Sequence, residues 1–110
     1  MKTNRKKTNR EIGDDFTITK INRRTSSGGA WVTGTIAGHK FNALVFAEHA
    51  VCPSYELDDS RISKLWLQRI SDGKTVVNFD RGWDVEPTDN TAKAIVDFLT
   101  TGLADCIYHE

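Results

Sequence analysis

Apolar and polar residues alternate through most of residues 16–80, in short runs separated by glycine-rich or strongly polar stretches. Such alternation gives an extended segment one apolar and one polar side, which is typical of a half-buried β-strand. Five runs fit this description, at residues 16–19, 31–36, 39–46, 61–70 and 75–80. The pattern therefore predicts an antiparallel sheet of about five strands.

Short turns join these runs into hairpins. Ala37 and Gly38 separate the second run from the third, and glycine supplies the positive φ that a tight hairpin turn needs. Asp72 and Gly73 lie in the turn between the last two runs, and this pair tolerates a left-handed backbone. Runs joined this closely pair as antiparallel neighbours, so we predict a sheet built from hairpins.

The pattern changes to helical spacing after Pro87, with Thr88 or Asp89 able to cap the new element. Apolar residues then recur three or four positions apart, which predicts an amphipathic helix of about four turns. They are Ala92, Ile95, Val96, Leu99, Leu103, Cys106 and Ile107. Strands followed by one helix predict an α+β fold in which the C-terminal helix covers one face of the sheet.

The second face of such a sheet would carry lysine, glutamine, asparagine and threonine in partial contact with water. We expect Trp31, Trp66 and Trp83, the largest apolar side chains, to build or edge the core. A chain of 110 residues with 38% hydrophobic and 27% charged residues suits one globular domain. No apolar run reaches the roughly 18–20 residues that cross a bilayer, and none follows the basic start, so we expect a cytoplasmic protein without membrane contact.

Positive charge is concentrated in the first ten residues, although the chain as a whole has 15 basic and 15 acidic residues. Residues 1–15 are polar almost throughout and cannot bury enough surface to offset the cost of ordering. We therefore predict a flexible arm at 1–15 and a single domain at 16–110. The arm is either a solvated terminus, which we favour, or a contact for nucleic-acid phosphates. The residues that would make that contact are Lys2, Arg5, Lys6, Lys7 and Arg10.

Residues 47–60 are the least regular stretch, and long loops in compact domains are often functional. We take this loop as the first candidate for a protein-binding surface, with Tyr55 as the anchor and with a basic partner surface opposite its acids. The candidate residues are Tyr55, Glu56, Asp58 and Asp59. The alternative surface is the exposed face of the sheet, around Lys64, Gln68 and Asn78.

The residues that could bind a metal or act as catalysts do not complete a motif. His49 lies three positions from Cys52, and Cys106 three from His109, so each pair offers half of a zinc site. Nothing in the sequence brings the pairs together, and we expect free thiols, no metal and no cofactor. The carboxylates could support acid–base chemistry or hold a cation, but a solvated acidic rim is the simpler interpretation. An enzyme is therefore the third hypothesis, after a protein-binding module and a nucleic-acid-associated protein.

The most distinctive string follows the last predicted strand. Arg81 lies between Asp80 and Asp84, which suggests an ion pair, while Gly82 can turn the chain and Trp83 can fold back. We interpret these five residues as a structural corner that closes the sheet onto the helix, because exposed ion pairs add little and aromatic corners pack well.

Three segments carry a resemblance: residues 31–36 (WVTGTI), 60–65 (SRISKL) and 79–84 (FDRGWD). Over residues 30–100 the chain resembles a family of small proteins of unknown function found in phages, plasmids and other bacterial mobile elements. The resemblance supplies no catalytic residues. It implies a bacterial accessory protein that modulates a host or defence system. The missing catalytic motif, the small size and the long loop with apolar and acidic residues make a non-catalytic interaction module the leading hypothesis. The resemblance implies that it binds a host or defence protein.

Overall fold

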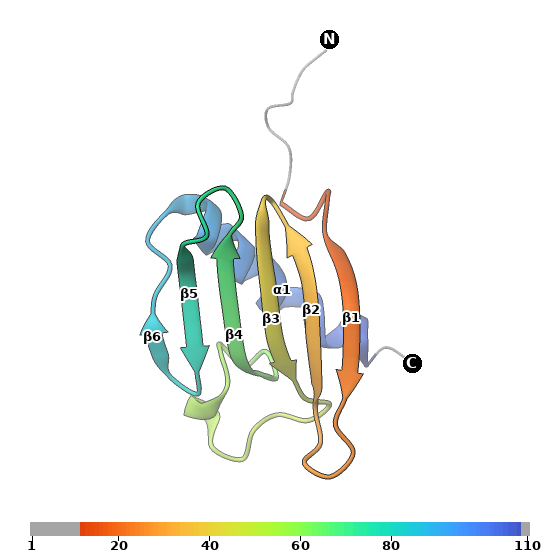
Figure 1. Cartoon of the computed structure of the whole chain (residues 1–110). Coiled ribbons are helices and arrows are strands. Elements are labelled where there is room, and N and C mark those ends of the chain that lie inside the picture. Colours follow the sequence, from red (N-terminus) through yellow and green to blue (C-terminus); the bar gives the residue numbers. More distant parts are fainter. Residues whose placement is uncertain (1–11, 109–110) are drawn as a thin grey trace.

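Six strands form one antiparallel sheet in the computed structural model, which describes residues 12–108 (Figure 1). The strands follow one another in chain order, so each pairs with the next. They are β1 (Thr17–Arg23), β2 (Ala30–Ile36), β3 (His39–Val45), β4 (Ile62–Arg69), β5 (Thr75–Asp80) and β6 (Trp83–Val85). A short 3-10 turn, η2 (Pro53–Tyr55), lies between β3 and β4, and a helix, α1 (Asn90–Ile107), follows β6. The predicted α+β fold is confirmed.

Two strands differ from the prediction. β6 has only three residues and pairs with the end of β5, so it is too short for alternation to reveal it. β1 continues to Arg23, well past the predicted run, because a bulge between Ile18 and Lys20 breaks its alternation.

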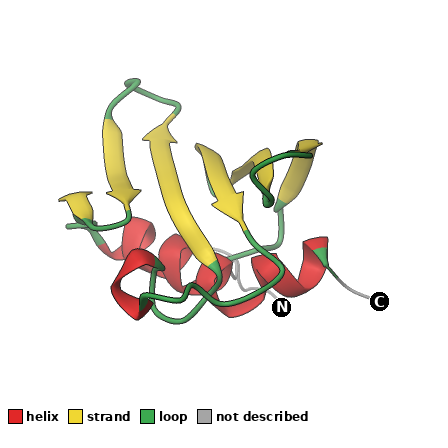
Figure 2. Cartoon of the chain, turned by 90° about the horizontal axis from the view of Figure 1, so that it is seen from below, coloured by secondary structure: helices red, strands yellow, loops and turns green. Residues whose placement is uncertain are grey.

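The helix α1 lies across one face of the sheet (Figure 2). Asp89 caps it, since its carboxylate accepts a hydrogen bond of 2.7 Å from the backbone N–H of Ala92. Cys106 is exposed although the spacing placed it on the buried stripe, and Ala104 is buried instead. No helix in the described part of the chain is long and apolar enough to span a membrane.

The core lies between α1 and the face of the sheet that it covers. Val32, Phe41 and Leu65 from the three central strands are at most 1% exposed, as are Ile95 and Leu99 from the helix. Their burial confirms the predicted arrangement, with one apolar stripe of the helix packed against one apolar side of the strands.

Residues 12–15 form a turn against the domain, although the sequence assigned them to the flexible arm. Ile12 packs against the core, and the Asp15 carboxylate accepts a hydrogen bond of 2.9 Å from the backbone N–H of Ala37. The predicted arm therefore extends too far into the domain, because one apolar side chain and one turn suffice to order this segment. The rest of the arm, residues 1–11, lies outside the described residues.

The other face of the sheet is not covered by α1, and we call it the open face. It carries the predicted polar residues, but also two tryptophans that we expected in the core. Its central residues are Trp31, Asn42, Lys64, Trp66, Gln68 and Asn78. The chain neighbours of both tryptophans point into the core, so strand alternation turns the indoles outward, where they are half-buried. Trp83 alone edges the core as predicted, 39% exposed, with its ring 5.2 Å from that of Phe79.

Three connections meet at one end of the sheet: the β1–β2 loop, the long β3–β4 loop and the β5–β6 turn (Figure 1). In a sheet whose strands pair in chain order, every second connection lies at the same end. The topology therefore gathers residues 24–29, 46–61 and 81–82, which are far apart in sequence.

Candidate functional site

A cleft of about 460 Å³ lies where these three connections meet. The long loop forms one wall, and the ends of β3 and β4 contribute Leu44 and Lys64. Its lining includes three arginines, one lysine and the rings of a phenylalanine and a tyrosine. They are Arg24, Phe46, Tyr55, Arg61, Lys64 and Arg81. Two acids, Glu48 and Glu56, also line the cleft.

Two arginines are held in the cleft by aromatic rings. The guanidinium of Arg24 lies 5.7 Å from the ring centre of Phe46, and that of Arg81 lies 5.3 Å from the ring centre of Tyr55. Each ring attracts its cation without neutralising it. Within residues 12–108, neither guanidinium forms an ion pair with a carboxylate. Both charges therefore remain available to an anion that enters the cleft.

The other two cations already have partners. Arg61 pairs with Asp105 of α1 and donates a 3.1 Å hydrogen bond to the carbonyl of Ala47, so it ties the loop to the helix. Lys64 lies 3.6 Å from Asp80, its cross-strand neighbour on the open face.

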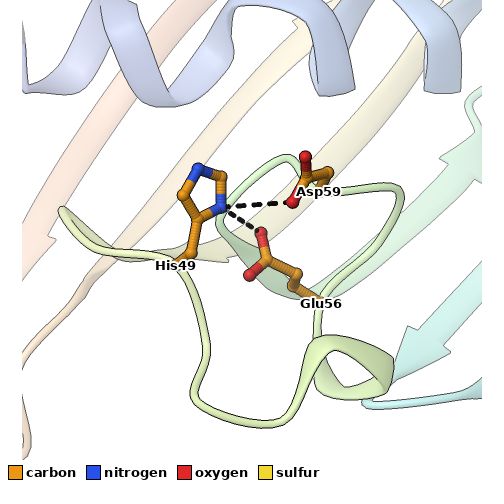
Figure 3. Close-up of side chains that lie close together, drawn as sticks. All are labelled: His49, Glu56 and Asp59. Carbon is orange, nitrogen blue, oxygen red and sulfur yellow. Dashed lines mark hydrogen bonds and ion pairs between the residues drawn. The ribbon is translucent and has the colours of Figure 1, made fainter.

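The long loop is held in shape by Glu56, whose side chain is only 3% exposed. Its carboxylate accepts hydrogen bonds of 2.6 Å from the backbone N–H groups of Ala50 and Arg61. It also lies 2.9 Å from Nδ1 of His49, and Asp59 lies 3.5 Å from the same nitrogen (Figure 3). We call His49, Glu56 and Asp59 the loop clasp.

The contacts within the clasp shift the pKa values of His49 and Glu56. The hydrogen bond to Glu56 raises the pKa of His49, and the nearby negative charges of Glu56 and Asp59 add to the effect. Burial of the Glu56 carboxylate opposes its ionisation. The hydrogen bonds from His49 and from two backbone N–H groups outweigh that burial and hold the pKa of Glu56 below its ordinary value.

These shifts predict how stability depends on pH. His49 stabilises the fold below its ordinary pKa of 6.5, and this contribution disappears as pH rises through its raised pKa. Glu56 stabilises the fold above its ordinary pKa of 4.5, and this contribution disappears as pH falls through its lowered pKa. The clasp is therefore strongest between about pH 4.5 and 6.5.

We expect the melting temperature of the wild type to decrease as the pH is raised from about 6 to about 8. In His49→Gln we expect this decrease to be smaller. Scanning calorimetry across this range would measure it. Glu48→Gln changes an exposed carboxylate outside the clasp and should keep the wild-type slope. An identical slope in His49→Gln would show that the clasp does not respond to pH in this range.

The clasp also contains the kinds of group that bind metals. One ligand atom from each of His49, Glu56 and Asp59 lies within 4.8 Å of the others. However, the Glu56 oxygens already accept three hydrogen bonds, and Nδ1 of His49 faces a carboxylate that it can donate to. We therefore interpret the cluster as a hydrogen-bonded support of the loop.

The thiols of the two half-sites considered for zinc are both exposed. The Cys52 sulfur lies 3.3 Å from the hydroxyl of Ser54, and Cys106 lies on α1. His109 lies outside the described residues. The candidate nucleic-acid contacts of the arm also lie there. These are Lys2, Arg5, Lys6, Lys7 and Arg10.

The predicted partner-binding residues separate into three environments. Tyr55 is 47% exposed and lines the cleft. Glu56 is buried, so its carboxylate serves the loop and is not presented to a partner. Asp58 and Asp59 are exposed and adopt left-handed backbone conformations, with φ of 51° and 63°.

The predicted corner forms the β5–β6 turn, but without the expected ion pair. Asp80 lies opposite Lys64 and pairs with it, while Arg81 stacks on Tyr55. The turn places Arg81 in a left-handed conformation with φ of 55°, and the backbone N–H of Asp80 donates to the carbonyl of Gly82. The idea of an Arg81–aspartate pair was therefore wrong, because strand register provides Asp80 with a different cation.

Sequence reasoning missed Arg24, Phe46 and the outward tryptophans. Trp31 and Trp66 line a shallow hollow of about 140 Å³ on the open face, together with Lys64. Alternation within each strand could have revealed that the tryptophans point outward, since the residues two positions away from each of them in the strand are polar. No local pattern could have found Arg24, because only the topology brings it to the cleft.

A family model described as a domain of unknown function (DUF7678) matches residues 30–104. No curated protein and no solved structure matches the chain. The match begins at β2 and ends within α1, so it includes most of the sheet, the long loop and the β5–β6 turn. It leaves out β1 and Arg24. Because the match covers more than half of the chain, the chain belongs to this family of unknown function, DUF7678.

Proposed function

We propose that this protein is a non-catalytic interaction module that binds an anionic partner in the cleft. The observation that carries the proposal is the pair of arginines, Arg24 and Arg81, each supported by an aromatic ring and neither neutralised by a carboxylate among the described residues. Guanidinium groups stay protonated at neutral pH, which suits them to holding an anion rather than to transferring protons.

The proposal keeps the long loop as the partner surface but reverses the charge expected of the partner. The sequence favoured a basic partner because the loop is acidic. Glu56 is committed to the loop clasp, and neither Asp58 nor Asp59 lines the cleft. Arg24 and Arg81, contributed by other connections, supply positive charge that a ligand would meet there, and they outnumber the one exposed acid of the cleft, Glu48.

The biological setting is part of the same proposal. The resemblance to proteins of phages, plasmids and other mobile elements implies an accessory protein of bacteria. We propose that the module acts there by binding and modulating a component of the host or of its defence systems.

Removing both arginines tests the role of the cleft. Inorganic tripolyphosphate should raise the melting temperature of the wild type, because a ligand that binds only the folded state stabilises it. In Arg24→Gln/Arg81→Gln we expect the affinity to fall at least about tenfold, since hydrogen bonds to charged groups contribute roughly 1.5–3 kcal/mol each.

The control is Lys74→Gln/Lys93→Gln, which removes the same charge at two exposed residues that do not line the cleft. It should bind tripolyphosphate like the wild type. If both double variants lose affinity equally, the anion responds to overall charge and the cleft is not its site. If the arginine variant binds like the wild type, the proposal is wrong.

A further inference from the structure

The open face beside the cleft combines two aromatic side chains with amides and cations. Trp31 on β2 pairs across the sheet with Leu44, and Trp66 on β4 pairs with Asn42. Leu44 and Asn42 are two positions apart on β3, so the two indoles lie on one face, on either side of β3 and offset by two residues. The hollow that they line is also lined by Lys64, Asn78 and Asp80.

Both indoles are partly buried, and that of Trp66 is also fixed by a hydrogen bond. The indole N–H of Trp66 donates a hydrogen bond of 3.3 Å to the hydroxyl of Thr75, and both side chains are half-buried. A ring fixed in this way can stack against a planar group with little further loss of conformational freedom.

Lys64 joins this hollow to the cleft, because it lines both. Lys20 and Lys40 are exposed cations on the open face, and the acid Asp80 already pairs with Lys64. The surface is therefore continuous, with rings and amides on the sheet and the two unpaired arginines at its end.

Building on the proposed function, we propose that the anionic partner is single-stranded nucleic acid. Bases stack on Trp31 and Trp66 and meet the amides of Asn42 and Asn78, while the phosphates that follow reach Arg24 and Arg81. Aromatic platforms beside a cationic groove are how proteins hold single strands, because every base has a face that can stack and every phosphate carries a charge.

The shape of the surface favours a single strand over other anions. A small ligand usually occupies a concave pocket of at least about 300 Å³, whereas the hollow at the tryptophans has a volume of about 140 Å³. A duplex hides the faces of its bases in the stack and would leave both indoles without a partner. An acidic peptide would use the arginines but has no need of two aromatic platforms.

The test measures fluorescence anisotropy of a labelled DNA strand of about ten nucleotides at low salt, with RNA of the same sequence as a second probe. We expect Trp31→Thr and Trp66→Thr each to weaken binding roughly 5- to 150-fold, the range for loss of one stacked base. Trp31→Phe keeps a ring and should lose less. Trp83→Thr changes a tryptophan outside the open face and should bind like the wild type.

A second measurement requires no substitution of Trp31 or Trp66. Stacking on an indole quenches its fluorescence, so an unlabelled strand should quench the emission of the wild type and of Trp83→Thr. In Arg24→Gln/Arg81→Gln, the slope of log K against log salt should also become shallower by about 0.7 for each phosphate that the variant no longer neutralises. A strand that binds without quenching either protein would overturn the inference.

The outcomes separate this inference from the proposed function. If the single strand binds through the arginines but is indifferent to Trp31 and Trp66, the cleft binds anions and the inference is wrong. The same holds if a duplex or an oligoglutamate peptide binds as tightly as the single strand. If no anionic probe responds to the arginines, both proposals fail. A preference for DNA or for RNA would identify which strand the surface serves.

Discussion

Leu99→Ala is expected to lower the free energy of unfolding by roughly 2–5 kcal/mol, because it opens a cavity beneath the helix. Leu99 is 0% exposed and lies in the apolar stripe of α1, against the central strands of the sheet. Its neighbours are packed in turn and can collapse only partly into the space. Urea denaturation would report the change as a lower midpoint with an unchanged slope.

The matched control is Lys93→Ala, an exposed position of the same helix that also favours alanine. Its unfolding midpoint should stay close to that of the wild type. A wild-type midpoint in Leu99→Ala would mean that the buried stripe of the helix is assigned to the wrong side. The packing of the helix that leaves the open face uncovered would then be wrong as well.

Gly34→Ala is the second large effect that we expect, with a loss of about 3 kcal/mol, at the upper end of what overpacking usually costs. A Cβ at residue 34 would clash with the carbonyl oxygen of Thr17 and would lie 2.8 Å from the ring of Phe41. Because the first of these contacts is with backbone, β1 itself must move. That strand leads into the loop that carries Arg24, so we also expect tripolyphosphate to bind less tightly.

The control makes the same chemical change at a place with room for it. Gly102 lies within α1 and has no atom within 4 Å of the site where a Cβ would be. Gly102→Ala should therefore raise stability by up to about 1 kcal/mol, since alanine is the better helix former. Opposite signs at the two glycines would confirm the close approach of β1 to β2, and a stable Gly34→Ala protein would refute it.

The order and type of the main elements could be predicted from the sequence alone. Alternation indicated the strands, the turn residues around Gly38 and Gly73 indicated hairpins, and helical spacing indicated α1. These features depend on residues close together in the chain, so local patterns are enough to reveal them. Where the local pattern was interrupted, as at the bulge in β1, the prediction ended too early.

The tryptophans show that a pattern can be present and still be misjudged. Trp31 shares its side of β2 with two threonines, and Trp66 shares its side of β4 with Lys64 and Gln68. Alternation alone therefore places both indoles away from the apolar side. The expectation that large apolar side chains lie in the core conflicts here with the alternation of buried and exposed positions along each strand. The structure follows the alternation.

The candidate site was decided by the tertiary structure. Glu56 looked like a surface acid, but the folding of loop 46–61 buries it against backbone N–H groups of the same loop. Arg24 and Arg81 come from opposite ends of the sequence of strands, and only the meander places their connections at the same end of the sheet. Local sequence determined the strands and the helix because hydrogen bonds and apolar periodicity act over a few residues. The cleft depends on contacts between segments far apart in the chain, which form only when the whole sheet is assembled.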